Sequence, residues 1–149
     1  MSGSGKSSVI RELAARGLMA IDTDWNPEWE CVGANGDEWV WREDRIRLLL
    51  DEQHASTLFV SACVSNQGMF YGRFDEVILL SAPESVTVQR LASRTDNPYG
   101  KLPEEIADVL RYKATIEPKL RESATAEIDT SIPLEEVVSR VLEISLLER

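Results

Sequence analysis

The sequence predicts an α/β domain with a parallel sheet. Short apolar runs alternate along its 149 residues with segments whose apolar residues recur at helical spacing. This alternation is typical of parallel strands joined by helices. A glycine-rich stretch near the N-terminus leads directly into the first helical segment. With 43% apolar residues the chain can bury one substantial core, so residues 1–149 are expected to form a single domain.

The first half of the chain is expected to contain two helices and two strands. Gly17 is a residue of the C-cap type, so the first helix should end just before it. Residues 25–37 include Pro27, Gly33 and Gly36 and favour an irregular excursion over the end of the sheet. The other elements expected here are a helix over 7–16, a strand over 18–21, a helix over 39–53 and a buried strand over 57–62.

The second half is expected to continue the same alternation. Residues 81–84 have the S-x-x-E form of a capping box that opens a helix, and the segment 95–102 that follows this helix is predicted to be a loop. Pro103 has a fixed φ that suits the first turn of the next helix. Ser131 and Pro133 are expected to open the closing helix. The remaining expected elements are a strand over 76–80, a helix to about residue 94 and a short strand over 125–128.

The most informative motif is Gly3-Ser4-Gly5-Lys6-Ser7 at the start of the first predicted helix. Backbone N–H groups of such a loop surround phosphate groups, and glycine is needed where a side chain would block the approach. The Lys6 ammonium is expected to reach the β- and γ-phosphates of ATP, and the Ser7 hydroxyl to bind Mg²⁺. A disordered Ser/Gly-rich tail is the alternative, but a helix and a strand follow at once. The residues expected to bind nucleotide here are Gly3, Ser4, Gly5, Lys6, Ser7 and Ser8.

The complete motif, G-x-x-x-x-G-K-[ST], is longer than the part present. Counting back from Gly5, its first glycine would precede Met1, as would the buried strand that normally feeds the loop. Such a strand would lie in the middle of the sheet, and its loss would expose the neighbouring strands. We therefore expect a start codon assigned too far downstream or a truncated chain. The chain as written is expected to be poorly stable and to bind ATP weakly.

With this loop, Asp22-Thr23-Asp24 and the later helix–loop–helix, the chain resembles the shikimate kinase, gluconate kinase and nucleoside-monophosphate kinase branch of P-loop proteins over nearly its whole length. Residues 97–101 (Asn-Pro-Tyr-Gly-Lys) and 127–130 (Glu-Ile-Asp-Thr) also resemble AAA-type ATP-binding proteins. The resemblance implies a P-loop NTPase fold of the nucleoside-monophosphate-kinase type, an open parallel sheet with helices on both faces, here with its first strand missing. It also implies transfer of a phosphoryl group from ATP·Mg²⁺ to a small metabolite.

The resemblance assigns an acceptor-binding region to about residues 23–53. Asp22 and Asp24 match an acidic pair that serves the Mg²⁺ shell and the accepting hydroxyl. Such a carboxylate can orient a hydroxyl and accept its proton, although either one could instead cap a turn. Arg42 matches a substrate-binding arginine. In a helix over 39–53 it would fall within the apolar stripe, where it would need an anionic substrate or a structural carboxylate.

Several features bear on the identity of the acceptor. Residues 62–64 are Ala-Cys-Val where shikimate kinases carry a glycine triplet, and Glu117 replaces an arginine, so shikimate is not the expected substrate. Ser65 should lie at the carboxyl end of a strand, where open α/β sheets bind ligands. Four tryptophans could form an aromatic wall for a sugar or base or simply pack the region: Trp25, Trp29, Trp39 and Trp41.

Residues 95–102 resemble the lid that closes over ATP in this branch. Arg90 and Arg94 precede it, one helical turn apart. Arg94 resembles the arginine that stacks on adenine, while Lys101 or Arg90 could stabilise charge on the transferred phosphoryl group. Both arginines could instead be exposed surface residues. The segment from Thr130 to Pro133 matches an adenine-contacting loop, and further candidates for anion contact are Arg111 and Lys113.

The composition argues against several partners. The net charge is −10, whereas proteins that bind nucleic acid need a basic face. No apolar run approaches the roughly 18 residues of a membrane span, and the N-terminus lacks the features of a secretory signal. We expect a cytoplasmic protein that acts on a small-molecule phosphate acceptor, with its oligomeric state open. A regulatory ATP-binding module with slow hydrolysis, or a degenerate protein that has lost ATP binding with its first strand, are the alternatives.

Overall fold

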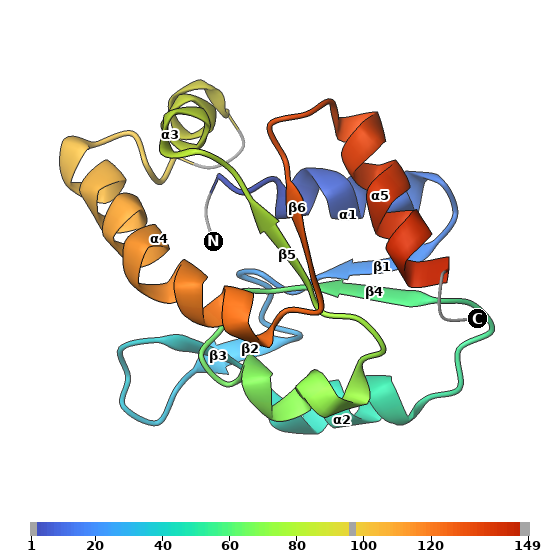
Figure 1. Ribbon diagram of the computed structural model, residues 1–149. Coiled ribbons are helices and arrows are strands. Elements are labelled where there is room, and N and C mark those ends of the chain that lie inside the picture. Colours follow the sequence, from blue (N-terminus) through green and yellow to red (C-terminus); the bar gives the residue numbers. More distant parts are fainter. Residues whose placement is uncertain (1–2, 96–97, 147–149) are drawn as a thin grey trace. The chain divides into compact units, whose positions relative to one another are not determined.

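The computed structural model describes residues 3–95 and 98–146. It divides into two compact units: unit 1 comprises Met1–Lys6 with Glu76–Arg149, and unit 2 comprises Ser7–Asp75. The elements of unit 2 are α1 (Lys6–Ala15, whose first residue belongs to unit 1), β1 (Met19–Asp22), β2 (Glu30–Val32), β3 (Trp39–Trp41), α2 (Glu43–Asp51), β4 (Leu58–Ser61) and the 3₁₀ helix η1 (Gln67–Arg73). Those of unit 1 are β5 (Ile78–Ser81), α3 (Glu84–Ser93), α4 (Pro103–Ser123), β6 (Ala126–Asp129) and α5 (Leu134–Leu146) (Figure 1).

The predicted α/β class is confirmed by two parallel strand pairs, one in each unit. In unit 2, β1 pairs with β4 and places Asp22 opposite Ser61. In unit 1, β5 pairs with β6 and places Ser81 opposite Asp129 (Figure 1). Each pair consists of apolar runs, and the connection between its strands includes helices, α2 in unit 2 and α3 with α4 in unit 1. Because the strands of a pair are parallel, their carboxyl ends meet at one edge.

Unit 2 has its own apolar core. Trp41, Ile46, Val64 and Phe70 form a buried cluster, and the rings of Trp41 and Phe70 meet edge to face at 5.7 Å. Asn66 connects this core to the end of β3, since its side-chain carbonyl accepts a hydrogen bond from Trp41 N at 2.9 Å and its amide donates one to Trp41 O at 3.0 Å. One asparagine therefore satisfies both backbone groups of a buried residue.

The predicted helix over 39–53 is wrong at its start. Residues 39–41 form β3, which pairs with β2 in an antiparallel hairpin. The sequence there is Trp-Val-Trp, and aromatic and β-branched residues favour a strand. Helix α2 begins only at Glu43, with Arg42 as its N-cap. Arg42 therefore lies outside the helix, and its expected place in the apolar stripe is wrong.

Unit 1 is organised around β5 and β6. Helix α5 contacts β6 and helix α3 contacts α4, and the buried apolar residues include Leu91 of α3 with Val137 and Val138 of α5. The valines lie on the stripe that the helical spacing predicts for α5. Among the residues that the structure describes in both units, no helix has the length and apolarity needed to cross a membrane.

Helix ends in unit 1 follow the prediction in one case and contradict it in another. Pro103 begins α4, as expected. The capping box over 81–84 is wrong, because Ser81 belongs to β5 and its carbonyl accepts Thr130 N at 2.7 Å. The N-cap of α3 is Pro83, and no side chain caps it. The hydrogen bond between Ser81 and Thr130 therefore extends the strand pairing at a position where the local sequence pattern predicted a helix cap.

Candidate nucleotide-binding site

The glycine loop belongs to unit 1 as far as Lys6. Gly3 and Gly5 have φ angles of +78° and +93°, values that glycine adopts at little cost and other residues adopt rarely. A Cβ on Gly3 would also lie 2.8 Å from Thr87 Cγ2 and 3.2 Å from its carbonyl oxygen. Gly3 is thus required by its conformation and by its contact with α3. Ser4, between the two glycines, is buried.

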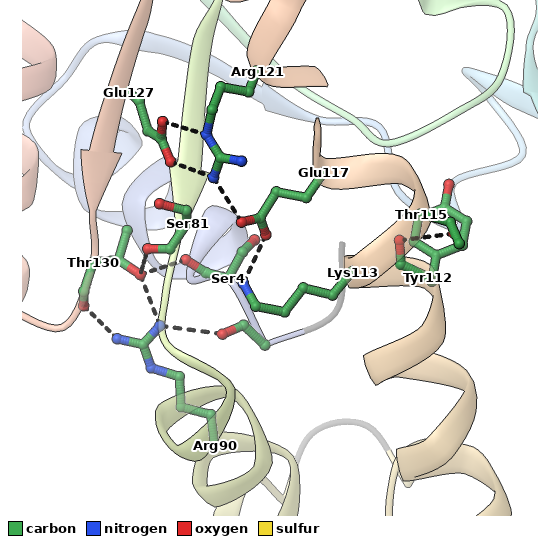
Figure 2. Close-up of polar contacts among 11 residues, drawn as sticks. Ser4, Ser81, Arg90, Tyr112, Lys113, Thr115, Glu117, Arg121, Glu127 and Thr130 are labelled. Carbon is green, nitrogen blue, oxygen red and sulfur yellow. Dashed lines mark hydrogen bonds and ion pairs between the residues drawn. The ribbon is translucent and has the colours of Figure 1, made fainter. Parts of the chain in front are cut away.

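Two side chains bind the carbonyl groups of this loop (Figure 2). Arg90 Nη1 donates to the Gly3 carbonyl at 3.1 Å and to Thr130 Oγ at 2.8 Å, and Nη2 donates to the Thr130 carbonyl. Thr130 Oγ lies 2.7 Å from the Ser4 carbonyl and 3.1 Å from the Ser81 carbonyl. Thr130 is only 4% exposed. The carbonyl side of the loop is therefore occupied by the protein itself.

The guanidinium of Arg90 is bound within unit 1. Arg90 is not an exposed surface arginine, since it bonds two parts of unit 1 that are far apart in sequence. Burial lowers the pKa of its guanidinium, and the neighbouring Asp129 carboxylate partly offsets this. The pKa of Asp129 is itself lowered, chiefly by the Ser131 hydroxyl, which donates to it.

Pro133, expected to belong to an adenine-contacting loop, is exposed, and its carbonyl accepts Glu136 N and Val137 N at the start of α5.

Unit 2 brings together the two residues expected to bind metal. Ser7 Oγ donates to Asp22 Oδ2 at 2.8 Å, while Asp22 Oδ1 accepts Ser61 Oγ at 3.2 Å and Asp24 N at 3.1 Å. A hydroxyl and a carboxylate are oxygen ligands of the kind that Mg²⁺ takes together with substrate phosphates and water. In the described part of the chain, no group of three or more His, Cys, Asp or Glu could hold a metal alone. The Ser7–Asp22 pair fits a metal that the nucleotide helps to bind.

The segment after β1 carries Asp24 and an exposed aromatic pair. Trp25 has a φ of 59°, rare for a bulky residue, and its N–H donates to Glu30 Oε2 at 3.1 Å. Trp25 is 68% and Trp39 40% exposed, and their rings meet edge to face at 6.0 Å. The backbone thus holds an unfavourable conformation beside two solvent-exposed indoles.

The other two tryptophans pack inside unit 2. Trp41 is buried, and its indole N–H donates to Thr23 Oγ at 2.8 Å. Trp29 packs against the core cluster, with the Arg45 guanidinium 5.5 Å from its ring centre. The expected aromatic wall therefore applies at most to Trp25 and Trp39. Thr23, which also donates to Ser61 O at 2.8 Å, was missed by sequence reasoning; its position between two acidic residues was the available signal.

Arg42 and Ser65 are both placed in unit 2. Arg42 Nη1 donates to the Pro27 carbonyl at 3.4 Å, and Nη2 lies 3.9 Å from Asp44 Oδ2. These are weak, exposed contacts, so the guanidinium retains donor capacity for a ligand. Ser65 is exposed beyond the carboxyl end of β4, as expected.

Arg94, just before the segment 95–102 of unit 1, and Lys101 within it both donate to backbone carbonyls. Arg94 lies beyond the end of α3 as its C-cap and donates to the Tyr99 carbonyl. Lys101 Nζ donates to the carbonyls of Ala92 at 2.7 Å and Arg94 at 2.6 Å. The expectation that Arg90 and Arg94 act from the same side of one helix is wrong, because they bind different parts of unit 1. Asn97, part of the expected lid motif, lies outside the described residues.

A chain of ion pairs runs along α4 to β6 (Figure 2). Lys113 Nζ lies 2.7 Å from Glu117, Glu117 lies 2.9 Å from Arg121, and Arg121 lies 2.8 Å from Glu127. The hydrogen bond from Arg121 lowers the pKa of Glu127. Arg111 pairs with Asp108 on the exposed side of α4. Lys113, an expected anion contact, is therefore paired within the protein.

Parallel strand pairs joined by helices, with the glycine loop at the N-terminus of α1, define an α/β protein of the P-loop NTPase fold. A family model described as an AAA domain matches residues 1–111. The chain therefore belongs to this family, whose P-loop domains bind nucleotide together with Mg²⁺. A search of curated proteins gave no match.

Proposed function

We propose that the protein is an ATP-dependent kinase that phosphorylates a hydroxyl group of a small metabolite. The observation that carries this proposal is the hydrogen bond between Ser7 and Asp22 at 2.8 Å. It joins the last residue of the glycine-loop motif to the carboxyl end of a parallel strand, where ligands bind in such sheets. Asp24, bonded through its N–H to Asp22, adds a second carboxylate at the same strand end.

Different residues of the chain would bind the phosphates, hold the metal and accept the proton of the acceptor. The N–H groups of the loop and the Lys6 ammonium would bind the phosphates. Ser7 and Asp22 would hold Mg²⁺, which would neutralise negative charge on the phosphates. Asp24 would orient the acceptor hydroxyl and take its proton while the oxygen of that hydroxyl bonds to the γ-phosphorus. The bond from that phosphorus to the β,γ-bridging oxygen breaks, and ADP leaves.

The acceptor is proposed to bind along the segment that follows β1. The exposed indoles of Trp25 and Trp39 offer an apolar face, and carboxylates can accept hydrogen bonds from hydroxyl groups. Arg42 and Ser65 would supply further polar contacts. A small polyhydroxylated molecule, with C–H faces and hydroxyl edges, matches both kinds of surface. A nucleic-acid or membrane partner forms no part of this proposal.

A second candidate is a regulatory ATP-binding module with slow hydrolysis. The observation that favours it is the pairing of the cations near the expected lid, because Arg94 and Lys101 donate to backbone carbonyls. Either side chain would have to exchange these partners before it could stabilise a transferred phosphoryl group. In a kinase, acceptor and ATP together would supply the free energy for this exchange.

The deciding measurement is ADP formation by the full chain with ATP and Mg²⁺ across a panel of sugars, polyols and hydroxy acids. We expect one chemical class to raise the rate above the basal rate. Asp24→Asn should lower the stimulated rate by roughly 100-fold, the usual effect of losing a general base, with ATP affinity retained. Asp75→Asn, an exposed change outside the site, is the control. A basal rate that no acceptor raises would favour the regulatory module instead.

A further inference from the structure

The carbonyl groups of the glycine loop in unit 1 are bound by two side chains that lie far from the loop in sequence. Arg90 comes from α3 and Thr130 follows β6, and they bind the carbonyls of Gly3 and Ser4 (Figure 2). Thr130 and Ser4 are 126 positions apart in the chain. Since Thr130 also lies 2.8 Å from Arg90 Nη1, the two side chains act as one group, which we name the loop clamp.

We propose that the loop clamp, Arg90 with Thr130, positions the N–H groups of the glycine loop for phosphate. This inference rests on the nucleotide binding in the proposed function and assigns both residues a positioning role in place of a direct contact with phosphate or adenine.

The argument follows from peptide geometry. In a planar trans peptide, the C=O of one residue and the N–H of the next point in opposite directions. The Gly3 carbonyl shares its peptide with the Ser4 N–H, and the Ser4 carbonyl shares its peptide with the Gly5 N–H. Because the clamp binds both carbonyls, it turns both N–H groups to the opposite side of the loop. Donors aligned in this way form an anion-binding concavity before the anion arrives.

The packing around the loop supports the same role. A Cβ on Gly5 would lie 3.6 Å from Arg90 Nη1 and 3.6 Å from Thr130 Oγ, so the loop rests directly on the clamp. Thr87, one turn before Arg90 on α3, contacts Gly3 from the same helix. The guanidinium also places a positive charge behind the loop, on the side opposite the proposed phosphate. The field of this charge would favour an anion at the proposed phosphate position.

The test separates phosphate from adenosine. Affinity for inorganic tripolyphosphate, ATP and adenosine is measured by calorimetry on the full chain and on Thr130→Val, which removes the hydroxyl at nearly constant shape. We expect the affinity for tripolyphosphate and ATP to fall roughly tenfold, the usual effect of losing a buried hydrogen bond, with adenosine affinity unchanged. Thr130→Ser keeps the hydroxyl and should bind all three ligands as the unchanged chain does. Thr115→Val is the matched control, since it removes a threonine hydroxyl that donates to the Arg111 carbonyl at 2.9 Å on exposed α4.

Each outcome decides the question. Equal tripolyphosphate affinity in Thr130→Val and the unchanged chain would overturn the clamp and leave the proposed function standing. An equal loss for adenosine would show a general structural or adenine-contacting role and also overturn it. If the unchanged chain binds neither tripolyphosphate nor ATP, the proposed function itself fails. Should Thr130→Val lose its circular dichroism signal, Arg90→Lys replaces it; it keeps the charge but not the two-nitrogen fork, and the same selective loss is expected.

Discussion

The glycine loop of unit 1 and the segment after β1 in unit 2 both depend on left-handed backbone, but they obtain it in opposite ways. Gly3 and Gly5 adopt positive φ at little cost, and the partly buried Arg90 and the buried Thr130 bind the carbonyls around them. Trp25 adopts a φ of 59° although it is a bulky residue that is 68% exposed. Such strain costs about 1–2 kcal/mol. The loop is built for rigidity, whereas the second segment retains an unfavourable conformation that presents an aromatic side chain.

This contrast suggests which part of the site is general and which is specific. A phosphate-binding loop can bind the phosphates of any nucleoside triphosphate, so its conformation can be fixed before the ligand binds. An acceptor site must match one chemical class, and unusual backbone at an exposed position is a reason to look for function there. We expect substitutions in the loop to affect every reaction of the protein, and substitutions at Trp25 to affect only the acceptor.

The largest effect is expected from Lys6→Met. Removing the ammonium group takes away a charge that stabilises the transferred phosphoryl group, and turnover should fall by about 100-fold or more. Steady-state ADP formation with a stimulating acceptor measures this loss. Lys119→Met, an exposed change on α4, controls for the loss of a lysine. Turnover that survives Lys6→Met would break the proposed role of the loop and leave only the fold class.

The second effect separates backbone strain from steric contact in the loop. Gly3→Ala places a Cβ at positive φ and 2.8 Å from Thr87, whereas Gly17→Ala has positive φ with nothing within 4 Å. Gly17→Ala should destabilise by about 1–2 kcal/mol from strain alone. Gly3→Ala should add the contact with Thr87 and weaken ATP binding as well. Gly68→Ala, where a Cβ meets nothing within 4 Å and φ is not positive, should be close to neutral.

Urea unfolding and ATP titration of the three variants measure these effects. If Gly3→Ala matched Gly17→Ala in stability and bound ATP as the unchanged chain does, the close packing of the loop on α3 would be unimportant for function.

Regular elements of the fold were predictable because each leaves a local pattern. The four parallel strands are apolar runs, and α5 has a valine stripe at helical spacing. The hairpin formed by β2 and β3 was missed for a local reason as well. The apolar spacing of Ile46 and Leu49 continues backwards through Trp39, so a helix pattern extended over residues that prefer a strand.

The candidate site was predictable only where its residues are close in sequence or belong to a motif. Ser7 and Asp22 could be assigned because the motif fixes one and the end of an apolar run fixes the other. The contacts of Arg90 and Thr130 join positions 87 and 126 residues apart in the chain. No spacing rule links such positions, so helical periodicity suggested instead that Arg90 and Arg94 act together. Thr130 directly follows β6, and its N–H donates to the Ser81 carbonyl at the end of β5.

A smaller effect is expected at Trp25. Asparagine tolerates left-handed backbone better than tryptophan does, so Trp25→Asn should keep the stability of the chain nearly unchanged although the edge-to-face pair with Trp39 is lost. If the exposed indoles bind the acceptor, the KM for the acceptor should rise roughly five- to tenfold, with the KM for ATP unchanged. Acceptor and ATP titrations on the same preparation measure the two constants. An unchanged acceptor KM would contradict the role of Trp25 and would require another reason for its strained backbone.

The smallest effect concerns pH and tests the backbone contacts of the segment next to α4. Glu105 Oε2 accepts Leu102 N at 3.2 Å, Gly100 N at 2.9 Å and Lys101 N at 3.1 Å. These bonds, above all the one from Leu102, lower the pKa of Glu105 from its ordinary value of 4.5. Because the folded pKa lies below the unfolded one, the stabilisation is fully present above about pH 4.5 and disappears as the pH falls through the folded pKa.

Glu105→Gln should therefore reduce the loss of thermal stability between neutral and acid pH, while Glu104→Gln on the same turn should not. If both variants have the thermal stability of the unchanged chain at every pH, the Glu105 carboxylate does not hold this segment in solution. The contacts of Arg94 and Lys101 with the backbone carbonyls beside it would then be readily exchanged for contacts with a phosphate.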